Sequence, residues 1–300
     1  MKTTYQGEYK QRLDIFLSEQ NPDVSRSQIK KIIINGQVSV NDQVPTVHFW
    51  LKKNDVIVYD LKNQRLEDTV LTAPKIKKET ADYVVIEKPS GLLVHPTDKG
   101  EKNTLVTWLV KNYPQIKKID KDTTRTGLVQ RLDKDVSGLM VIPLSKKFFD
   151  DLKQQFVNRQ VFKEYLCLVN GQVLNDTGEI KSNLARDKKT GLTKIQLPGE
   201  GAEAHTLYEV VTRYINCTLL KVQIKTGRTH QIRAHLFSIG HSVVGDKLYQ
   251  TKDVRKKKKQ AEIRIFLHSH LLKFLGPDQK IVKTTSALPK ELKDYLKTLK

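Results

Sequence analysis

One aspartate stands out because of the residues around it. Asp133 ends an Arg-Leu-Asp triplet in the stretch 127–145, GLVQRLDKDVSGLMVIPLS, and precedes the apolar run Leu139–Leu144. A short run of this composition is typical of a buried strand, so Asp133 is expected on a tight loop that enters it. A carboxylate there loses much of its water and persists only if a cation or hydrogen bonds hold it. Asp133 is therefore a candidate catalytic carboxylate, and the alternative is a structural ion pair with Arg131 or Lys134.

Similar short runs recur through the C-terminal four fifths of the chain and predict its strands. The expected strands are Tyr83–Glu87, Leu139–Leu144, Glu164–Val169, Leu207–Val211, Thr218–Ile224 and Ile263–His268. Segments 146–158 and 229–240 have the apolar spacing of helices. Because strands outnumber helices and do not alternate strictly with them, the pattern indicates an α+β domain with a mixed sheet. The basic run 254–260, VRKKKKQ, predicts a loop.

The N-terminal residues 10–62 have the pattern of a separate module. Apolar residues at positions 13, 16 and 17 predict a short helix, and the S-x-x-Q sequence from Ser25 predicts the start of a second helix. That helix should end at Asn35-Gly36, before a hairpin whose strands include 38–40 and 56–58. The polar stretch 63–75 is expected to link this module to the rest of the chain.

Basic residues of the two predicted helices could form one face. Arg12, Arg26, Lys30 and Lys31 have positions that allow it. Such a face can bind phosphates, and the alternative is an ordinary solvated helix surface. Over all 300 residues, 53 Lys and Arg against 33 Asp and Glu give a net charge of +20. This excess favours nucleic acid over a membrane as the partner.

The sequence disfavours membrane proteins, secreted proteins and metal-binding proteins. The chain has neither an apolar run near the roughly 20 residues of a membrane span nor the apolar core of a signal peptide. The two cysteines are expected to be buried free thiols in a reducing cytoplasm. His230 with His235, and His268 with His270, could suggest a metal, but structural roles are expected because neither pair joins an acidic or Cys cluster.

Four ordered motifs carry a resemblance to a known family. They are EKPSGLLVHP at 87–96, QRLDKDVSGL at 130–139, FKEYLCLVNG at 162–171, and IKTGRTHQIRAHL at 224–236 followed by IGHSVVGDKLY at 239–249. Together they resemble the RluA-type pseudouridine synthases, which isomerise uridines in ribosomal and transfer RNA. The N-terminal module resembles the alpha-L RNA-binding module, which often precedes this domain. The implied fold is a mixed, largely antiparallel sheet with flanking helices at 76–300, after the two-helix and β-hairpin module at 10–62.

The resemblance implies roles for three residues at the reacting nucleotide. Asp133 matches the essential Asp that starts the reaction, Tyr165 the Tyr that packs on the uracil ring, and Arg233 the basic residue paired with the carboxylate. Pairing with Arg233 should lower the pKa of Asp133, which suits a nucleophile or base. The isomerisation requires neither metal nor redox cofactor, so none is expected.

Other residues are implied in binding RNA. Arg131 matches an Arg that holds the target base out of the stack, and Arg228 and His230 belong to the signature that contacts RNA. Arg12, Arg26 and Lys30 would contact RNA from the N-terminal module. Gln130 and Val136 depart from the usual His and Thr, which weakens assignment to a subgroup and hence to one uridine.

The sequence therefore predicts a cytoplasmic, monomeric RNA pseudouridine synthase that acts on large-subunit ribosomal RNA. Two alternatives stay open, a transfer-RNA synthase of the same fold and an RNA-binding or ribosome assembly factor without turnover. A DNA-binding regulator is disfavoured because a clear helix-turn-helix pattern is missing. The motifs leave open whether Asp133 attacks the sugar or the base, or whether the reaction proceeds through a glycal.

Overall fold

The protein is described from a computed structural model. It covers residues 1–22, 24, 26–61, 72–97, 101–120, 126–187, 190–250 and 263–300, with only the backbone at positions 27 and 31. The expected capping box at Ser25, most of the expected linker and the basic run 254–260 lie outside these residues, and the linker boundaries stay predictions. The chain divides into two compact units, Met1–Val70 and Leu71–Lys300. In the described part, no helix is long and apolar enough to cross a membrane.

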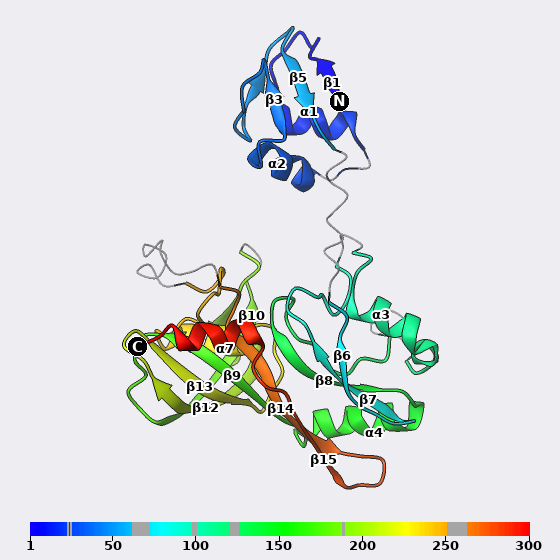
Figure 1. The fold of residues 1–300 in the computed structure, drawn as a ribbon, viewed down its shortest axis with the longest axis vertical. Helices are drawn as coiled ribbons and strands as arrows, with labels where there is room; N and C mark the ends of the chain where they lie inside the picture. Colours follow the sequence, from blue (N-terminus) through cyan, green and yellow to red (C-terminus); the bar gives the residue numbers. More distant parts are fainter. Residues whose placement is uncertain are drawn as a thin grey trace. The chain divides into compact units, whose positions relative to one another are not determined.

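The first unit contains two helices and a small sheet (Figure 1). Its elements are α1 Leu13–Gln20, α2 Arg26–Ile34, β1 Lys2–Thr4, β2 Gln11–Arg12, β3 Val38–Val40, β4 Trp50–Leu51 and β5 Val56–Tyr59. The antiparallel sheet has the order β1-β5-β3, and β2 pairs with β4. The apolar faces of both helices pack on the sheet through residues such as Leu13, Ile29 and Ile57. The helices and the strands β3 and β5 are those that the sequence predicts, whereas β1 precedes residue 10.

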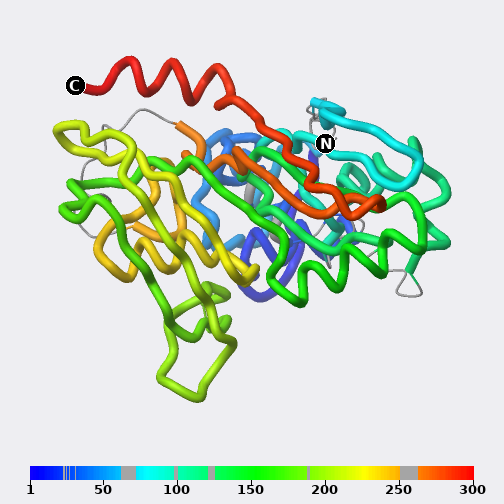
Figure 2. The backbone as a smooth tube through the Cα atoms, turned by 90° about the horizontal axis from the view of Figure 1, so that it is seen from below, coloured from blue at the N-terminus to red at the C-terminus, as the bar shows by residue number. Residues whose placement is uncertain are grey.

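The second unit is built on one large sheet. Its strands are β6 Lys75–Glu79, β7 Tyr83–Lys88, β8 Ser137–Pro143, β9 Phe162–Asn170, β10 Thr177–Arg186, β11 Thr193–Gln196, β12 Ala202–Arg213, β13 Cys217–Ile224, β14 Leu267–Leu275 and β15 Ile281–Thr285. The order is β11-β10-β12-β13-β9-β14-β8-β7-β6, with β15 on β14. The described strands of this sheet pair antiparallel except for β14 with β8, so the expected mixed, largely antiparallel sheet is confirmed. Figure 2 shows the β10–β11 hairpin extending beyond the rest of this unit.

The centre of the sheet joins two halves of the second unit. Strand β14 lies between β9, which continues to β13 and β12, and β8, which continues to β7 (Figure 1). The approach of β8 to β14 requires glycine at position 138, where φ is +121° and a Cβ would lie 2.3 Å from the Ser269 carbonyl oxygen. Asp133 lies five residues earlier, on the loop that leads into β8, and the central pair therefore fixes where this loop enters the sheet.

Helices cover the sheet and complete the core. They are α3 Leu105–Asn112, α4 Lys146–Val157, α5 Gln231–Ser238 and α7 Lys290–Lys297, with a 3₁₀ helix at Pro114–Lys118. The hydroxyl of Ser145 accepts a hydrogen bond from the Phe148 amide and caps α4. The largest core cluster joins Ile86, Met140 and Leu220 of the strands with Leu109 of α3 and Leu236 of α5.

The observed elements differ from the expected ones in identifiable places. Helices α3 and α7 and strands β6, β10, β11 and β15 were not predicted. The strand expected at Ile263–His268 begins only at Leu267. The Phe266 carbonyl already accepts a hydrogen bond from Leu168 of β9, but its amide bonds to the Val244 carbonyl of a loop. The other five strands and both expected helices of this unit are confirmed within a few residues.

Candidate active site

The Asp133 loop meets the β13–α5 connection at the middle of the sheet. Asp133 Oδ2 accepts a hydrogen bond from Arg233 Nη1 at 2.8 Å, across 100 residues of sequence. The pair is mostly buried, with side-chain exposures of 20% for Asp133 and 9% for Arg233. The structure thus brings together the carboxylate and the cation that the resemblance pairs, and the observed partner comes from α5 rather than from the neighbours Arg131 or Lys134.

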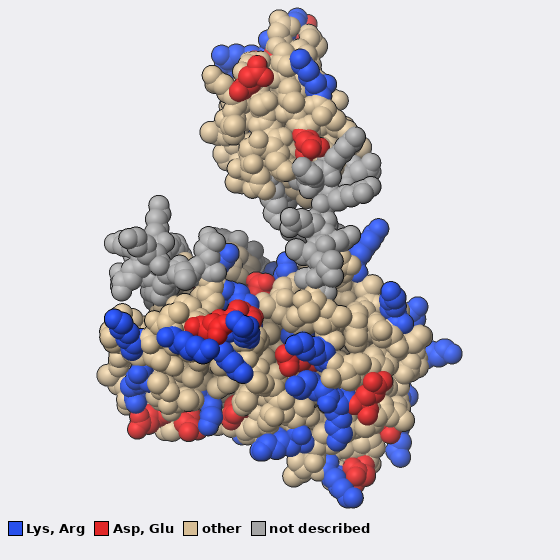
Figure 3. All heavy atoms as spheres, in the orientation of Figure 1, with Lys and Arg blue, Asp and Glu red and all other residues tan. Residues whose placement is uncertain are grey.

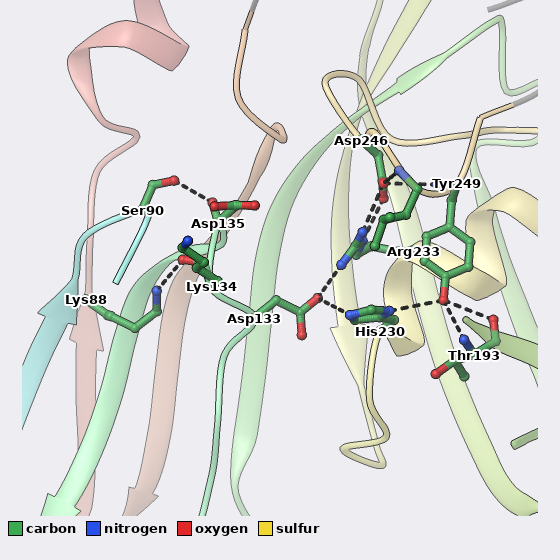
Figure 4. A network of polar contacts seen from close by, with 11 residues as sticks. Lys88, Ser90, Asp133, Lys134, Asp135, Thr193, His230, Arg233, Asp246 and Tyr249 are labelled. Carbon is green, nitrogen blue, oxygen red and sulfur yellow. Dashed lines mark hydrogen bonds and ion pairs between the residues drawn. The ribbon is translucent and has the colours of Figure 1, made fainter. Parts of the chain in front are cut away.

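A second carboxylate, which the sequence reasoning missed, holds Arg233 from the other side. Asp246 is fully buried, and its two oxygens accept hydrogen bonds from Arg233 Nε at 2.6 Å and Nη2 at 2.9 Å. Burial alone would lower the pKa of Arg233, but its contacts with Asp246 and Asp133 raise it overall. The guanidinium is therefore permanently charged and fixed in direction, with Nη1 aimed at Asp133 (Figure 4).

His230 extends this network toward Tyr249. His230 Nε2 lies 3.7 Å from Asp133 Oδ2, and its Nδ1 is 3.1 Å from the Tyr249 hydroxyl, which also bonds to the backbone of Thr193 (Figure 4). Burial lowers the pKa of His230, Asp133 opposes the shift, and the Arg233 charge reinforces it. His230 has the left-handed φ of +53°, a conformation that is uncommon for a residue with a side chain and concentrates at functional sites.

A fully buried lysine holds the backbone of the Asp133 loop. Lys88, at the end of β7, donates from Nζ to three carbonyl oxygens, those of Pro89, Leu92 and Lys134, at 2.8–2.9 Å. Burial lowers the pKa of Lys88 to about 7, although the charges of Asp135 and Asp133 oppose the shift. Lys88 was not singled out from the sequence, where a lysine at a strand end resembles an exposed residue.

Tyr165 forms one wall of a cavity of about 860 Å³ that also contains Asp133, Arg233 and His230. Tyr165 is on β9, and most of its ring lies in the core. Burial, together with the negative charge of Asp133, raises the pKa of its hydroxyl, which is therefore neutral at physiological pH. The cavity thus presents an aromatic ring and a charged carboxylate to the same space.

The cavity is strongly cationic. Among its described lining residues, the cations are Arg131, Lys153, Lys163, Lys225, Arg228 and Arg233, against the carboxylates Asp120 and Asp133. On the face of the second unit shown in Figure 3, Lys and Arg side chains are more numerous than Asp and Glu. A cavity with this charge concentrates polyanions at its mouth.

The signature loop between β13 and α5 is held by one glutamine. Gln231 Oε1 accepts hydrogen bonds from the Thr226 hydroxyl at 2.7 Å and the Arg228 amide at 3.0 Å. The exposed Arg228 side chain donates from Nε to the Glu203 carbonyl oxygen. Arg131 is exposed at the rim of the same cavity. Both arginines can therefore reach a ligand in the cavity.

The basic residues of the first unit gather around one buried carboxylate. Asp14 is completely buried and contacts Arg12 at 3.0 Å, Arg26 at 2.9 Å and Lys30 at 3.8 Å. Burial would raise the pKa of Asp14, but the hydrogen bonds from Arg12 and Arg26 lower it overall. Three of the four cations predicted to share a face therefore gather around Asp14, and the side chain of the fourth, Lys31, lies outside the described residues.

The histidines considered for metal binding have other partners. His235 lies between the hydroxyls of Ser182 and Thr206, at 3.0 and 2.9 Å. His268 lies between the hydroxyls of Ser137 and Ser286, at 2.8 and 3.1 Å. Burial lowers the pKa of both to about 4, so both are neutral at pH 7 and serve as buried hydrogen-bonding groups.

Comparisons with known proteins agree with this architecture. The family model of RNA pseudouridylate synthase matches residues 82–238, and that of the S4 domain matches residues 11–57. An uncharacterized RNA pseudouridine synthase of Aquifex aeolicus is 40% identical over 81% of this chain and 78% of its own. The ribosomal large subunit pseudouridine synthase D of Blochmanniella floridana is 32% identical over 96% of this chain and 94% of its own.

A solved structure shares the fold. Human RNA pseudouridylate synthase domain containing 4 superposes with a TM-score of 0.58 at 22% identity, over 76% of this chain and 93% of that chain. The small module expected at the N-terminus is the S4 domain, an RNA-binding module, and the expected fold class is confirmed. With family-model and sequence matches that span most of its length, the chain belongs to the RNA pseudouridine synthase family and is an enzyme that acts on RNA.

Proposed function

We propose that this synthase isomerises uridine in large-subunit ribosomal RNA, with the target nucleotide turned out of the RNA into the cavity beside Asp133. Support for the substrate comes from the relative named ribosomal large subunit pseudouridine synthase D, which covers nearly all of this chain. The observation that carries the site is the Asp133–Arg233 pair, 2.8 Å apart within a cavity that has room for a nucleotide.

The chemistry sets clear requirements for the residues. The N1–C1′ bond of uridine breaks, a C5–C1′ bond forms, C5 loses its proton and N1 gains one, so the reaction is balanced without an oxidant or a second substrate. In our proposal, the ionised Asp133 starts glycosidic cleavage, by attack on the sugar or the base or by elimination. Arg233 holds Asp133 in direction through its hydrogen bond while the substrate excludes water.

Access to those atoms requires the base to leave the RNA stack. Unstacking costs a few kcal/mol, and an aromatic surface recovers about 1–3 kcal/mol per base. We assign this stacking to Tyr165, which lines the cavity with Asp133. Arg131, exposed at the rim, would occupy the gap left in the RNA.

The remaining cations would hold the RNA backbone. Arg228 and His230 lie at the cavity, and Arg12, Arg26 and Lys30 form the cluster on the S4 domain. Their role predicts binding that weakens steeply with salt, since each neutralised phosphate releases counterions. We also infer that the enzyme works as a monomer in the cytoplasm.

The proposal is tested by pseudouridine mapping in cells that lack the protein. Carbodiimide labelling and reverse-transcriptase stops are compared after return of wild type, Asp133→Asn, or the control Asp135→Asn, which removes the same charge from an exposed position on the same loop. Large-subunit sites that return with wild type and Asp135→Asn, and stay absent with Asp133→Asn, are expected. If the lost sites are confined to transfer RNA, transfer RNA and not ribosomal RNA is the substrate. If Asp133→Asn restores the sites, Asp133 does not have the catalytic role assigned to it. If the map is unchanged in cells that lack the protein, and the protein still binds RNA, an assembly factor is favoured.

A further inference from the structure

A buried lysine in the cavity has no carboxylate partner among the residues that the structure describes. Lys163 is on β9, two residues before Tyr165, and side chains at this spacing project from the same face of a strand. Its exposure is only 9%, and it lines the same cavity as Tyr165 and Asp133. The ammonium is also beside the signature loop, since a Cβ placed on Gly227 would lie 3.7 Å from Nζ.

The described surroundings of Lys163 contain no carboxylate that neutralises its charge. Within the described part of the chain, its ammonium lies over the ring of Phe156, whose centroid is 5.2 Å from Nζ. Burial lowers its pKa to about 8, and none of the described carboxylates counters that shift. The contrast with Lys88 is clear, because Lys88 donates to three carbonyl oxygens and feels two nearby aspartates.

An isolated buried cation costs folding free energy, which a ligand anion can offset. RNA carries its negative charges on phosphate groups. The strand rise places Lys163 roughly 7 Å from Tyr165 along β9. This separation is comparable to that between the base of a nucleotide and its own phosphate.

We propose that Lys163 binds the backbone phosphate of the nucleotide whose base packs on Tyr165, and so helps to hold the target nucleotide out of the RNA. This inference rests on the proposed site for the flipped nucleotide. Lys163 is a binding residue in it, distinct from the exposed Arg131 and Arg228 because its side chain is largely buried. Lys153 and Lys225 line the same cavity and extend the positive surface along the path of the backbone.

The test compares Lys163→Met, which keeps the length of the side chain, with Lys163→Arg, which keeps the charge. Lys280→Met is the matched control, since Lys280 is 84% exposed in the turn after β14. All three are made in the Asp133→Asn background, so that turnover does not disturb binding. The dissociation constant for transcribed large-subunit ribosomal RNA is measured by filter binding over a range of KCl concentrations, and melting temperatures are measured without RNA.

We expect Lys163→Met to weaken binding about 10- to 100-fold, the range for a hydrogen bond to a charged group. The slope of log affinity against log salt should fall in magnitude by about 0.7–0.9, as for loss of one phosphate contact. Lys163→Arg should keep the wild-type slope, and Lys280→Met should change neither quantity. Because no carboxylate of the described residues pairs with this charge in the free protein, Lys163→Met should melt at the same temperature or higher.

Other outcomes separate this inference from the proposed function. A Lys163→Met protein that fails to fold, melts lower or keeps the wild-type salt slope overturns the phosphate contact and indicates a structural lysine. If wild type modifies transfer RNA instead of ribosomal RNA, the substrate proposal fails, and the same slopes measured on transfer RNA still decide the role of Lys163.

Discussion

The buried contact between Asp246 and Arg233 predicts that removal of the Asp246 charge alone slows the isomerisation. Asp246→Asn keeps the size of the side chain. Asp246 Oδ1 also accepts hydrogen bonds from the amides of Leu248 and Tyr249, at 2.8 and 3.1 Å. An asparagine that keeps its oxygen on these amides turns its NH₂ toward Arg233 Nε, where two donors then oppose each other. Arg233 therefore loses one of its two bonds to this residue and is free to rotate away from Asp133.

The magnitude follows from the two bonds. A hydrogen bond to a charged group contributes about 1.5–3 kcal/mol, and a neutral one about 0.5–1.5 kcal/mol. Loss of one charge-assisted bond and weakening of the other amounts to about 2–4 kcal/mol, which corresponds to about 30- to 1000-fold in the rate constant if the transition state depends fully on the direction of Arg233.

The assay is release of tritium from RNA labelled at uracil C5, under single-turnover conditions with saturating enzyme. The rate constant then does not depend on the fraction of active protein, so misfolding alone would leave it unchanged. Asp278→Asn, in the exposed turn after β14, is the control for loss of one carboxylate. A folded Asp246→Asn protein with the wild-type rate constant would refute the idea that Asp246 positions Arg233.

Two further predictions concern Tyr165 and Lys88. Tyr165→Phe keeps the stacking ring, so RNA affinity in filter binding should stay within a few-fold of wild type while tritium release slows; equal losses of affinity and rate would contradict a stacking role. Because the pKa of Lys88 is about 7 in the folded protein and 10.5 is its ordinary value, the unfolded state binds more protons between these pH values. The free energy of unfolding of wild type relative to Lys88→Met should therefore rise from pH 7 to pH 9 in urea titrations, and a fall over this range would count against the buried lysine.

Much of the second unit follows from local pattern. The apolar stripe of α4 and the β-branched run of β8 each specify their structure within a dozen residues, and both were predicted. Strand β10, TGEIKSNLAR, is half exposed and carries few apolar residues, so its period is weak. The Thr104 hydroxyl caps helix α3 by accepting a hydrogen bond from the Thr107 amide. This capping residue is visible in the sequence, but the Leu, Val and Trp residues that follow it have the composition of a strand.

In the site, too, residues within local motifs were predicted, whereas residues whose role depends on contacts distant in sequence were not. Asp133, Tyr165 and Arg233 were predicted from ordered motifs, and the structure brings all three to one cavity. Asp246 follows a glycine and precedes a polar residue, which reads as an ordinary turn. Only its burial against Arg233 of α5 distinguishes it. Lys88 and Lys163 were missed for a related reason, because lysine is rarely buried and nothing nearby in sequence indicates that a cavity or a loop encloses it.

The central pairing of β8 with β14 also constrains how the protein folds during its synthesis on the ribosome. Ser137 pairs with His268, and Asp133 contacts a residue that is synthesised 100 positions later. A nascent chain that has passed β9 but not yet β14 leaves the facing edges of β8 and β9 without the strand that joins them, and such edges recruit other chains. We expect products that stall or are cleaved before Leu267 to be inactive and prone to aggregate, so the enzyme gains its activity only when the last tenth of its sequence arrives.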